Sequence, residues 1–101
     1  MKKIRIVKKA VGEIPVVVDI ANELEAYKQI VGGWIECVYL NNNIIMVCNE
    51  EGKLEGLKEN FYMASLQDMI VGDVFFITSK REDFASLNEN QINIIMKWFE
   101  I

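Results

Sequence analysis

Histidine is absent from the 101 residues of this sequence. Its absence removes the usual general base near neutral pH, the commonest metal ligand and every pairing of a nucleophile with imidazole. Cysteine is scarce: Cys37 and Cys48 are the two in the chain, and both are expected to be reduced. The sequence therefore predicts no catalytic residue, no metal site and no cofactor.

Long apolar runs are also missing. No uninterrupted apolar segment approaches the length of a membrane span. The first residues include lysines, as a signal peptide would, but Arg5, Lys8, Lys9 and Glu13 interrupt any apolar core, and no small-residue cleavage site follows. We expect a cytoplasmic protein that does not bind membranes.

Positive charge is in the minority. Eleven Lys and Arg stand against fifteen Asp and Glu, which gives a formal net charge of −4. The average field of such a protein repels nucleic acid and anionic lipid, so general affinity for DNA or RNA is not expected. Hydrophobic residues make up 51% of the chain, enough for one core, and the length suits a single domain over residues 1–101.

The N-terminal half predicts two strands and a helix. Alternation over Lys2–Lys9 indicates a strand, whose lysines suggest either a protected sheet edge or an anion-binding patch. A second strand is expected at Val16–Val18, after a turn marked by Gly12 and Pro15. The following helix has Asn22 as its expected cap, Glu25 to complete a capping box, and Gly32-Gly33 at its end.

A hairpin is predicted from Trp34–Leu40 and Ile44–Asn49, with three asparagines between them. A two-residue turn would set Cys37 directly opposite Cys48. A three-residue loop would shift the register by one and place the two cysteines on opposite faces of the sheet. The sequence leaves both registers open.

The charged stretch NEEGKLEGLKEN, residues 49–60, holds a Gly-Lys pair. A phosphate-binding P-loop needs a glycine where Val47 stands and a serine or threonine where Leu54 stands. We therefore predict a chain reversal over Glu50–Lys53, with Gly52 at positive φ and a strand that restarts at Leu54.

The C-terminal half predicts a short strand at Asn60–Met63, a turn, and then a central strand over Met69–Ser79 that is buried on both faces. Gly72 within it suggests a bulge or a close approach of another backbone segment. After a charged loop at residues 80–83, Ser86 and Glu89 are expected to cap a second helix over Gln91–Phe99. Together these elements predict an α+β fold with a largely antiparallel sheet and two helices.

The second helix is apolar over more than one face. Ile94 and Trp98 widen the arc made by Leu87, Ile92, Ile95, Met96 and Phe99. A helix of this kind is wedged between layers or shared with a partner, so we predict a homo-oligomer, and a homodimer in particular.

Five segments occur in a characteristic order: VGGWIECVYL, VCNEEGKLEGL, then Asn60, IVGDVFFI and DFASLNENQI. Their series resembles a domain-of-unknown-function family of small proteins from phages, plasmids and conjugative elements. The chain departs from the family's Leu-Pro-x-Asn pattern with Leu57-Lys58-Glu59-Asn60, which leaves the loop shape freer. The resemblance implies a mobile-element protein in the bacterial host cytoplasm, and small acidic proteins in that setting often counter host defence.

The leading hypothesis is a non-catalytic binding protein that sequesters a nucleotide signal or occupies a host protein. Trp34, beside two glycines, offers an indole for binding, although core packing explains it equally well. Glu36 is more simply a partner for Lys53 or Lys58 across the sheet. The full set of candidate binding residues is Trp34, Glu36, Asn49, Lys53, Asn60 and Tyr62.

A nucleotide trap needs phosphate donors near a stacking ring. Candidate donors are Arg5, Lys53, Lys80 and Arg81, and candidate rings are Trp34, Tyr39 and Tyr62. Two other functions remain as alternatives. A small hydrolase would use carboxylates such as Glu50 with Glu51 or Glu82 with Asp83, but neighbours on a strand point to opposite faces. An acidic DNA mimic would use the glutamates between residues 50 and 59, which two lysines interrupt.

Overall fold

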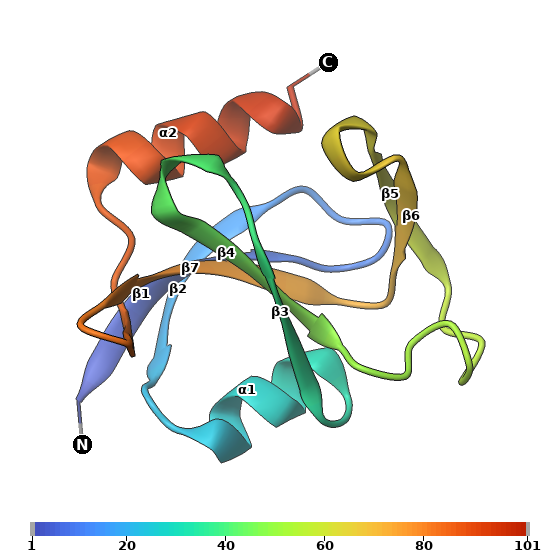
Figure 1. Ribbon diagram of the computed structural model, residues 1–101, viewed down its shortest axis with the longest axis horizontal. Helices are drawn as coiled ribbons and strands as arrows, with labels where there is room; N and C mark the ends of the chain where they lie inside the picture. The colour runs from blue at the N-terminus through green and yellow to red at the C-terminus, as the bar shows by residue number, and fades with distance from the viewer. Residues whose placement is uncertain (1, 101) are drawn as a thin grey trace.

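The computed structural model describes residues 2–100, which form one antiparallel sheet with a helix on each face (Figure 1). The sheet has the order β2-β1-β7-β4-β3, and β8 pairs with β7 beside this path. A separate two-stranded ribbon is made of β5 and β6. The strands are β1 (Lys3–Lys9), β2 (Val16–Ala21), β3 (Ile35–Tyr39), β4 (Ile44–Asn49), β5 (Glu59–Met63), β6 (Asp68–Val71), β7 (Val74–Lys80) and β8 (Asp83–Ala85); the helices are α1 (Leu24–Val31) and α2 (Glu89–Trp98).

The core has two halves, one on each face of the sheet. On one face, α1 covers apolar side chains that include Ile6, Val47 and Phe75. On the other face, α2 and the ribbon cover a second set that includes Met46 and Phe76. Because neighbouring residues of a strand alternate between faces, Phe75 and Phe76 anchor opposite halves. The predicted α+β class, with a largely antiparallel sheet and two helices, is confirmed.

The predicted central strand over residues 69–79 is half right. β7 is central and its residues Val74–Ile77 are fully buried. The chain breaks before it, however, because Gly72 has φ +76 and directs β6 into the ribbon instead of the sheet. A Cβ atom on Gly72 would stand 2.6 Å from Leu57 Cδ1, so the predicted close approach exists, although it involves a side chain.

The edge position predicted for the first strand is wrong. β1 lies between β2 and β7, and Lys9 at its end is buried. The period-two pattern correctly gives the faces of the strand, but it carries no information on which strands lie beside it. The true edges of the sheet are β2 and β3.

The hairpin adopts the three-residue loop. Asn41–Asn43 form a 3₁₀ turn (η1), and the register pairs Cys37 with Val47 and Cys48 with Glu36. The two cysteines therefore lie on opposite faces of the sheet, as the longer loop requires. The Leu40 amide closes the loop by donating to the Ile44 carbonyl at 2.8 Å.

Both predicted helix caps are misplaced. α1 begins after Glu23, which makes no side-chain cap, while Asn22 accepts a hydrogen bond from the Tyr27 hydroxyl. In α2 the capping box consists of Asn88 and Gln91. The C-terminal end of α1 is as predicted, with Gly32 in the left-handed conformation. Several residues near each helix start have capping chemistry, and the tertiary contacts of these side chains decide which one is used.

Two loop predictions also need correction. The reversal at Glu50 continues through Gly56, which has positive φ where Gly52 does not, and the next strand starts at Glu59 instead of Leu54. The charged loop after β7 is a two-residue hairpin turn, since Arg81 and Glu82 both have positive φ, and it leads into β8. Charge alone gave no sign of this short strand.

Candidate functional site

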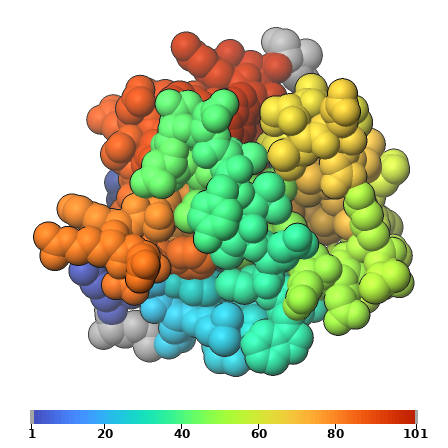
Figure 2. Space-filling view, viewed as in Figure 1, coloured from blue at the N-terminus to red at the C-terminus, as the bar shows by residue number. Residues whose placement is uncertain are grey.

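The largest concentration of exposed aromatic surface surrounds a groove between three elements. These are the β3–β4 loop, the turn of the β5–β6 ribbon (η2, Ala64–Leu66) and the end of α2, which border one another on the face shown in Figure 2. The groove encloses about 620 Å³. We call it the aromatic groove; its lining residues are Tyr39, Leu40, Asn41, Phe61, Tyr62, Met63, Ala64, Ser65, Leu66, Trp98 and Phe99.

The floor of the aromatic groove is held by ring contacts. Two ring pairs pack edge to face. The ring centroids of Trp98 and Phe76 in β7 lie 5.7 Å apart, and those of Phe61 and Phe99 lie 4.9 Å apart. Such contacts fix ring orientation, so the groove is largely formed before any ligand arrives. Although packed in this way, Trp98 is still 41% exposed.

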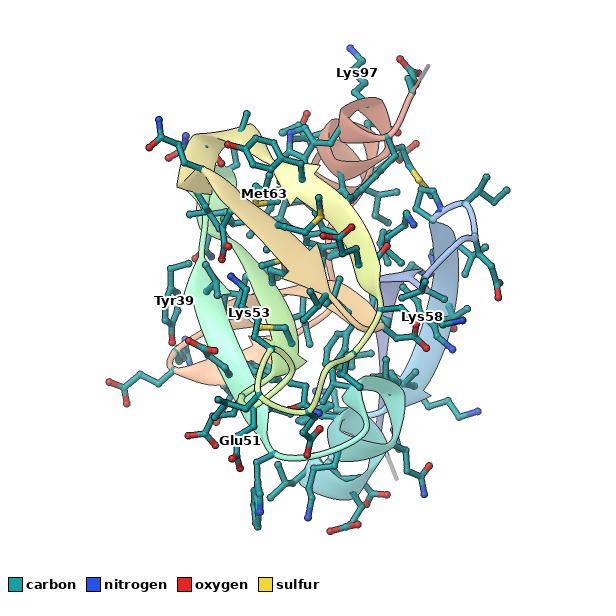
Figure 3. All side chains as sticks on the ribbon, turned by 90° about the vertical axis from the view of Figure 1, so that its right-hand side faces the viewer. Tyr39, Glu51, Lys53, Lys58, Met63 and Lys97 are labelled. Carbon is teal, nitrogen blue, oxygen red and sulfur yellow. The ribbon has the colours of Figure 1, made fainter. Side chains whose placement is uncertain are left out.

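The rim of the groove carries two tyrosines from different elements. Tyr62 projects from β5 and is 58% exposed, while Tyr39 at the end of β3 is 75% exposed. In Figure 3, which faces the ribbon, Tyr39 points outward from β3 and away from the ribbon. Exposed Tyr and Trp side chains combine large apolar area with one hydrogen-bonding group each, a combination that is enriched where proteins bind proteins.

The polar groups of the groove are neutral. Tyr62, Ser65, Asn41 and Trp98 carry neutral polar groups in the lining, whereas the Tyr39 side chain points away from the ribbon, and none of the described lining residues is charged. A phosphate would find no cation there to neutralise it. The described lining therefore offers apolar contacts and neutral hydrogen-bonding groups.

Asn60 fixes the ribbon to the sheet. Its amide nitrogen donates to the carbonyls of Lys9 (2.9 Å) and Gly72 (2.8 Å), and its oxygen accepts from Lys9 Nζ at 2.8 Å. Lys9 Nζ also donates to the Ala10 carbonyl and lies 5.8 Å from the centroid of the Phe99 ring. Burial lowers the pKa of Lys9, opposed by the nearby negative charges of Asp73 and Glu13. Asn60 thus holds the ribbon, which forms one wall of the groove, against β1.

A second, smaller cavity of about 240 Å³ lies between the hairpin and the ribbon and is bordered by Glu36, Asn49 and Lys53. The predicted partnership of Glu36 with Lys53 is not formed, because Lys53 pairs with Asp68 of β6. Figure 3 shows Lys53 on this side of the molecule. The exposed Glu36 carboxylate has no ion-pair partner within residues 2–100.

Asn49 connects the Val-Gly-Gly segment (residues 31–33) with the Asn-Glu segment that begins at Asn49 itself. Its side chain donates to the Val31 carbonyl (3.2 Å) and to Glu55 (3.1 Å), and accepts from the Glu51 amide (2.8 Å). A Cβ atom on Gly33 would stand 3.0 Å from the Asn49 amide nitrogen. The Val-Gly-Gly and Asn-Glu segments therefore meet at a buried polar joint, where glycine leaves room for the asparagine.

Trp34 is not a core residue. It is 58% exposed, and Lys28 Nζ lies 3.9 Å from the centroid of its ring. Lys28 also lies 3.8 Å from Glu25, so its charge is shared with a carboxylate. Trp34 belongs neither to the aromatic groove nor to the smaller cavity.

The six candidate residues do not form one site. Glu36, Asn49 and Lys53 border the smaller cavity, Tyr62 borders the aromatic groove, and Asn60 and Trp34 lie elsewhere. The proposed phosphate donors are dispersed as well: Arg5 pairs with Asp19 at 3.2 Å, and Lys80 and Arg81 border a different depression beside α1.

Sequence reasoning missed most of the groove. Trp98 and Phe99 are expected on one apolar helix, but nothing in the sequence predicts that Phe61 and Leu66 share a surface with them. Their separation along the chain hides the relationship. The one usable signal is the number of aromatic residues near residues 61–62 and 98–99.

The two cysteines are protected thiols. Burial, with smaller contributions from Glu36, Cys37 and Asp68, raises the pKa of Cys48 to about 11, and burial likewise raises the pKa of Cys37. At neutral pH both are protonated, which makes them poor nucleophiles. Across residues 2–100 no three Cys, Asp or Glu side chains gather closely enough to hold a metal ion, and no helix there is long and apolar enough to cross a membrane.

The chain belongs to the family described as domain of unknown function DUF3846, whose model matches residues 3–100. No curated protein and no solved structure matches it.

Proposed function

We propose that this protein is a non-catalytic binding protein that occupies the surface of another protein through the aromatic groove. The observation that supports the proposal most strongly is the groove itself. Trp98, Tyr62 and Leu66 come from separate elements yet expose 41%, 58% and 38% of their surface around one hollow. Exposed apolar surface of this kind marks sites of protein association.

A protein partner fits the groove better than a nucleotide signal does. The described lining has aromatic faces but no Lys or Arg to meet a phosphate. Lys28 does lie over the Trp34 ring, but its charge is shared with Glu25. One cation and one ring provide few contacts for the phosphate and base of a nucleotide. The acidic DNA-mimic alternative is also weaker, because Glu55 is used internally by Asn49.

The resemblance to proteins of phages and other mobile elements supplies the biological setting of the proposal. In that setting, the partner is a bacterial host protein in the cytoplasm, and the effect of binding is to block a defence function. The half-buried, protonated cysteines and the absence of histidine support the proposal of a protein that binds without turnover.

The proposal is tested by capture from bacterial extract followed by calorimetry with the purified captured protein. Trp98→Ser and Tyr62→Ser should each weaken binding at least about tenfold, as the loss of a central aromatic contact usually does. Ile14→Ser is the matched control, since Ile14 is 78% exposed and borders neither the groove nor the smaller cavity. Equal affinity of all three variants would rule out the groove as the binding site.

A further inference from the structure

The free edge of β3 is the other surface that the fold leaves unused. β3 is the last strand of the sheet, and in Figure 1 it lies nearest the viewer, with its outer side uncovered in Figure 2. Self-association was expected from the wide apolar arc of α2, but Ile94 and Met96 pack against the core of their own chain. Trp98, the other residue that widens this arc, is 41% exposed and borders the aromatic groove, whereas the β3 edge offers free backbone groups.

The hydrogen-bonding pattern identifies which backbone groups of β3 are free. The Leu40 amide donates to the Ile44 carbonyl, and the Glu50 amide donates to the Trp34 carbonyl, each at 2.8 Å. In an antiparallel ladder, bonded residues alternate with outward-facing ones. Even-numbered residues of β3 therefore bond to β4, and the N–H and C=O groups of Ile35, Cys37 and Tyr39 face outward.

We propose that β3 pairs with β3 of a second copy, antiparallel and about a two-fold axis at Cys37. This register sets Cys37 beside Cys37 of the second copy and each Ile35 beside the other chain's Tyr39. All three outward-facing residues of each strand then find partners, and the two sheets join into one. A two-fold contact of this kind closes on itself.

The side chains of β3 allow this register. Glu36 comes to lie opposite Val38 of the second copy, so no like charges face each other directly. Shifting the axis to Glu36 would set the two carboxylates opposite one another, which is unfavourable. The outward-facing positions of β3 hold neither lysine nor proline, the usual guards of a free edge.

The edge at β2 has residues that oppose pairing with a second copy. The Asn22 amide donates to the Lys2 carbonyl, so the outward-facing residues of β2 are Val17, Asp19 and Ala21. An axis at Asp19 would bring two carboxylates together. An axis one residue earlier would require an N–H from Pro15, which has none. β3 is therefore the edge available to a second copy.

The mass in solution tests the proposal. Light scattering at about 100 µM should report about twice the 11.6 kDa of one chain. Tyr39→Lys places a charge on the β3 edge at a side chain that is 75% exposed, and it should weaken dimerisation at least about tenfold. Val17→Lys, the matched change on β2, should leave the dimer intact. A monomeric wild type, or a dimer indifferent to Tyr39→Lys, would overturn the proposal.

Amide hydrogen exchange locates the interface independently of any substitution. The amides of Ile35, Cys37 and Tyr39 should exchange at least about tenfold more slowly in concentrated than in dilute protein, because dimerisation gives them acceptors. The amides of Glu36 and Val38 already bond to β4 and should show no comparable change. Equal behaviour of both sets would place the dimer contact elsewhere.

Discussion

Asparagine 60 shows how a single polar side chain can determine where a whole layer lies. Its amide donates to the carbonyls of Lys9 in β1 and of Gly72 between β6 and β7, and it also accepts from the buried Lys9 ammonium. Removing the amide would take one hydrogen bond from each of these groups and leave Lys9 Nζ with the Ala10 carbonyl, and a poorly paired buried charge is more costly than an unpaired carbonyl. Asn60 is therefore best understood as the attachment point of the ribbon.

Asn60→Ala should lower the free energy of unfolding by about 2–4 kcal/mol, because it leaves Lys9 and two carbonyls with fewer partners. Urea unfolding monitored by tryptophan fluorescence measures the change. Asn93→Ala is the control, since Asn93 is exposed on α2 and its loss should change stability by less than about 0.5 kcal/mol. Equal effects of the two substitutions would argue against the structural task assigned to Asn60.

The raised pKa of the Cys48 thiol leads to a prediction of how the free energy of unfolding depends on pH. Its pKa is raised from 9.0 to about 11, so the unfolded chain loses this proton at a lower pH than the folded one. The stabilisation is complete below about pH 9 and is lost as pH rises toward 11; solvent screening of this partly exposed thiol limits the loss to about 1–2 kcal/mol. The difference between wild type and Cys48→Val, followed by urea unfolding from pH 8 to 11, isolates this effect from those of Lys9 and Cys37. A constant difference would contradict the prediction.

At the scale of elements, the break between β6 and β7 creates the ribbon and hence the groove. Gly72 turns the chain out of the main sheet at positive φ, and Leu57 packs against the place where a side chain would begin. Without this turn, residues 68–80 would run on as one strand, and nothing would stand opposite α2 to form the second wall of the aromatic groove.

Gly72→Ala should therefore destabilise the protein more than Gly56→Ala does. Both glycines have similar positive φ values, +76 and +70, so both substitutions carry a conformational cost of about 1 kcal/mol. Only at Gly72 does the new Cβ meet an atom within 4 Å, Leu57 Cδ1, so its effect should be larger by about 1–3 kcal/mol. Thermal unfolding of the two variants gives the comparison, and equal melting temperatures would show that Leu57 adapts freely.

At the scale of the whole molecule, charge and binding surface are separated. The chain has a formal net charge of −4, whereas the described lining of the aromatic groove holds no charged residue. Binding through the groove should then depend on apolar contact instead of long-range attraction. A dimer through β3 would carry two such grooves, one on each copy.

Partner binding should accordingly depend little on salt. We expect the dissociation constant to change less than about threefold between roughly 50 and 500 mM NaCl, because few charges are desolvated on binding. Isothermal titration with the captured partner measures it. A DNA mimic that binds through its carboxylates would lose affinity steeply over this range, and such a loss would favour that alternative over the groove.

Local sequence patterns determined the elements of this protein well. Alternation of apolar residues identified β1, apolar β-branched runs identified the hairpin and most of β7, and Gly32 identified the end of α1, because these patterns are properties of neighbouring residues. The absence of histidine likewise bounded the available chemistry before any fold was known.

Tertiary structure decided which elements lie side by side. It placed β1 inside the sheet and separated β6 from β7. It gave Asn49 and Asn60 hydrogen bonds to distant segments. It also brought Trp98 to the same groove as Tyr62, 36 positions earlier in the sequence. These outcomes depend on contacts between distant residues, whose energies do not appear in any local pattern. For that reason local patterns determined most elements of this fold, whereas packing between distant residues created its groove and its free edge.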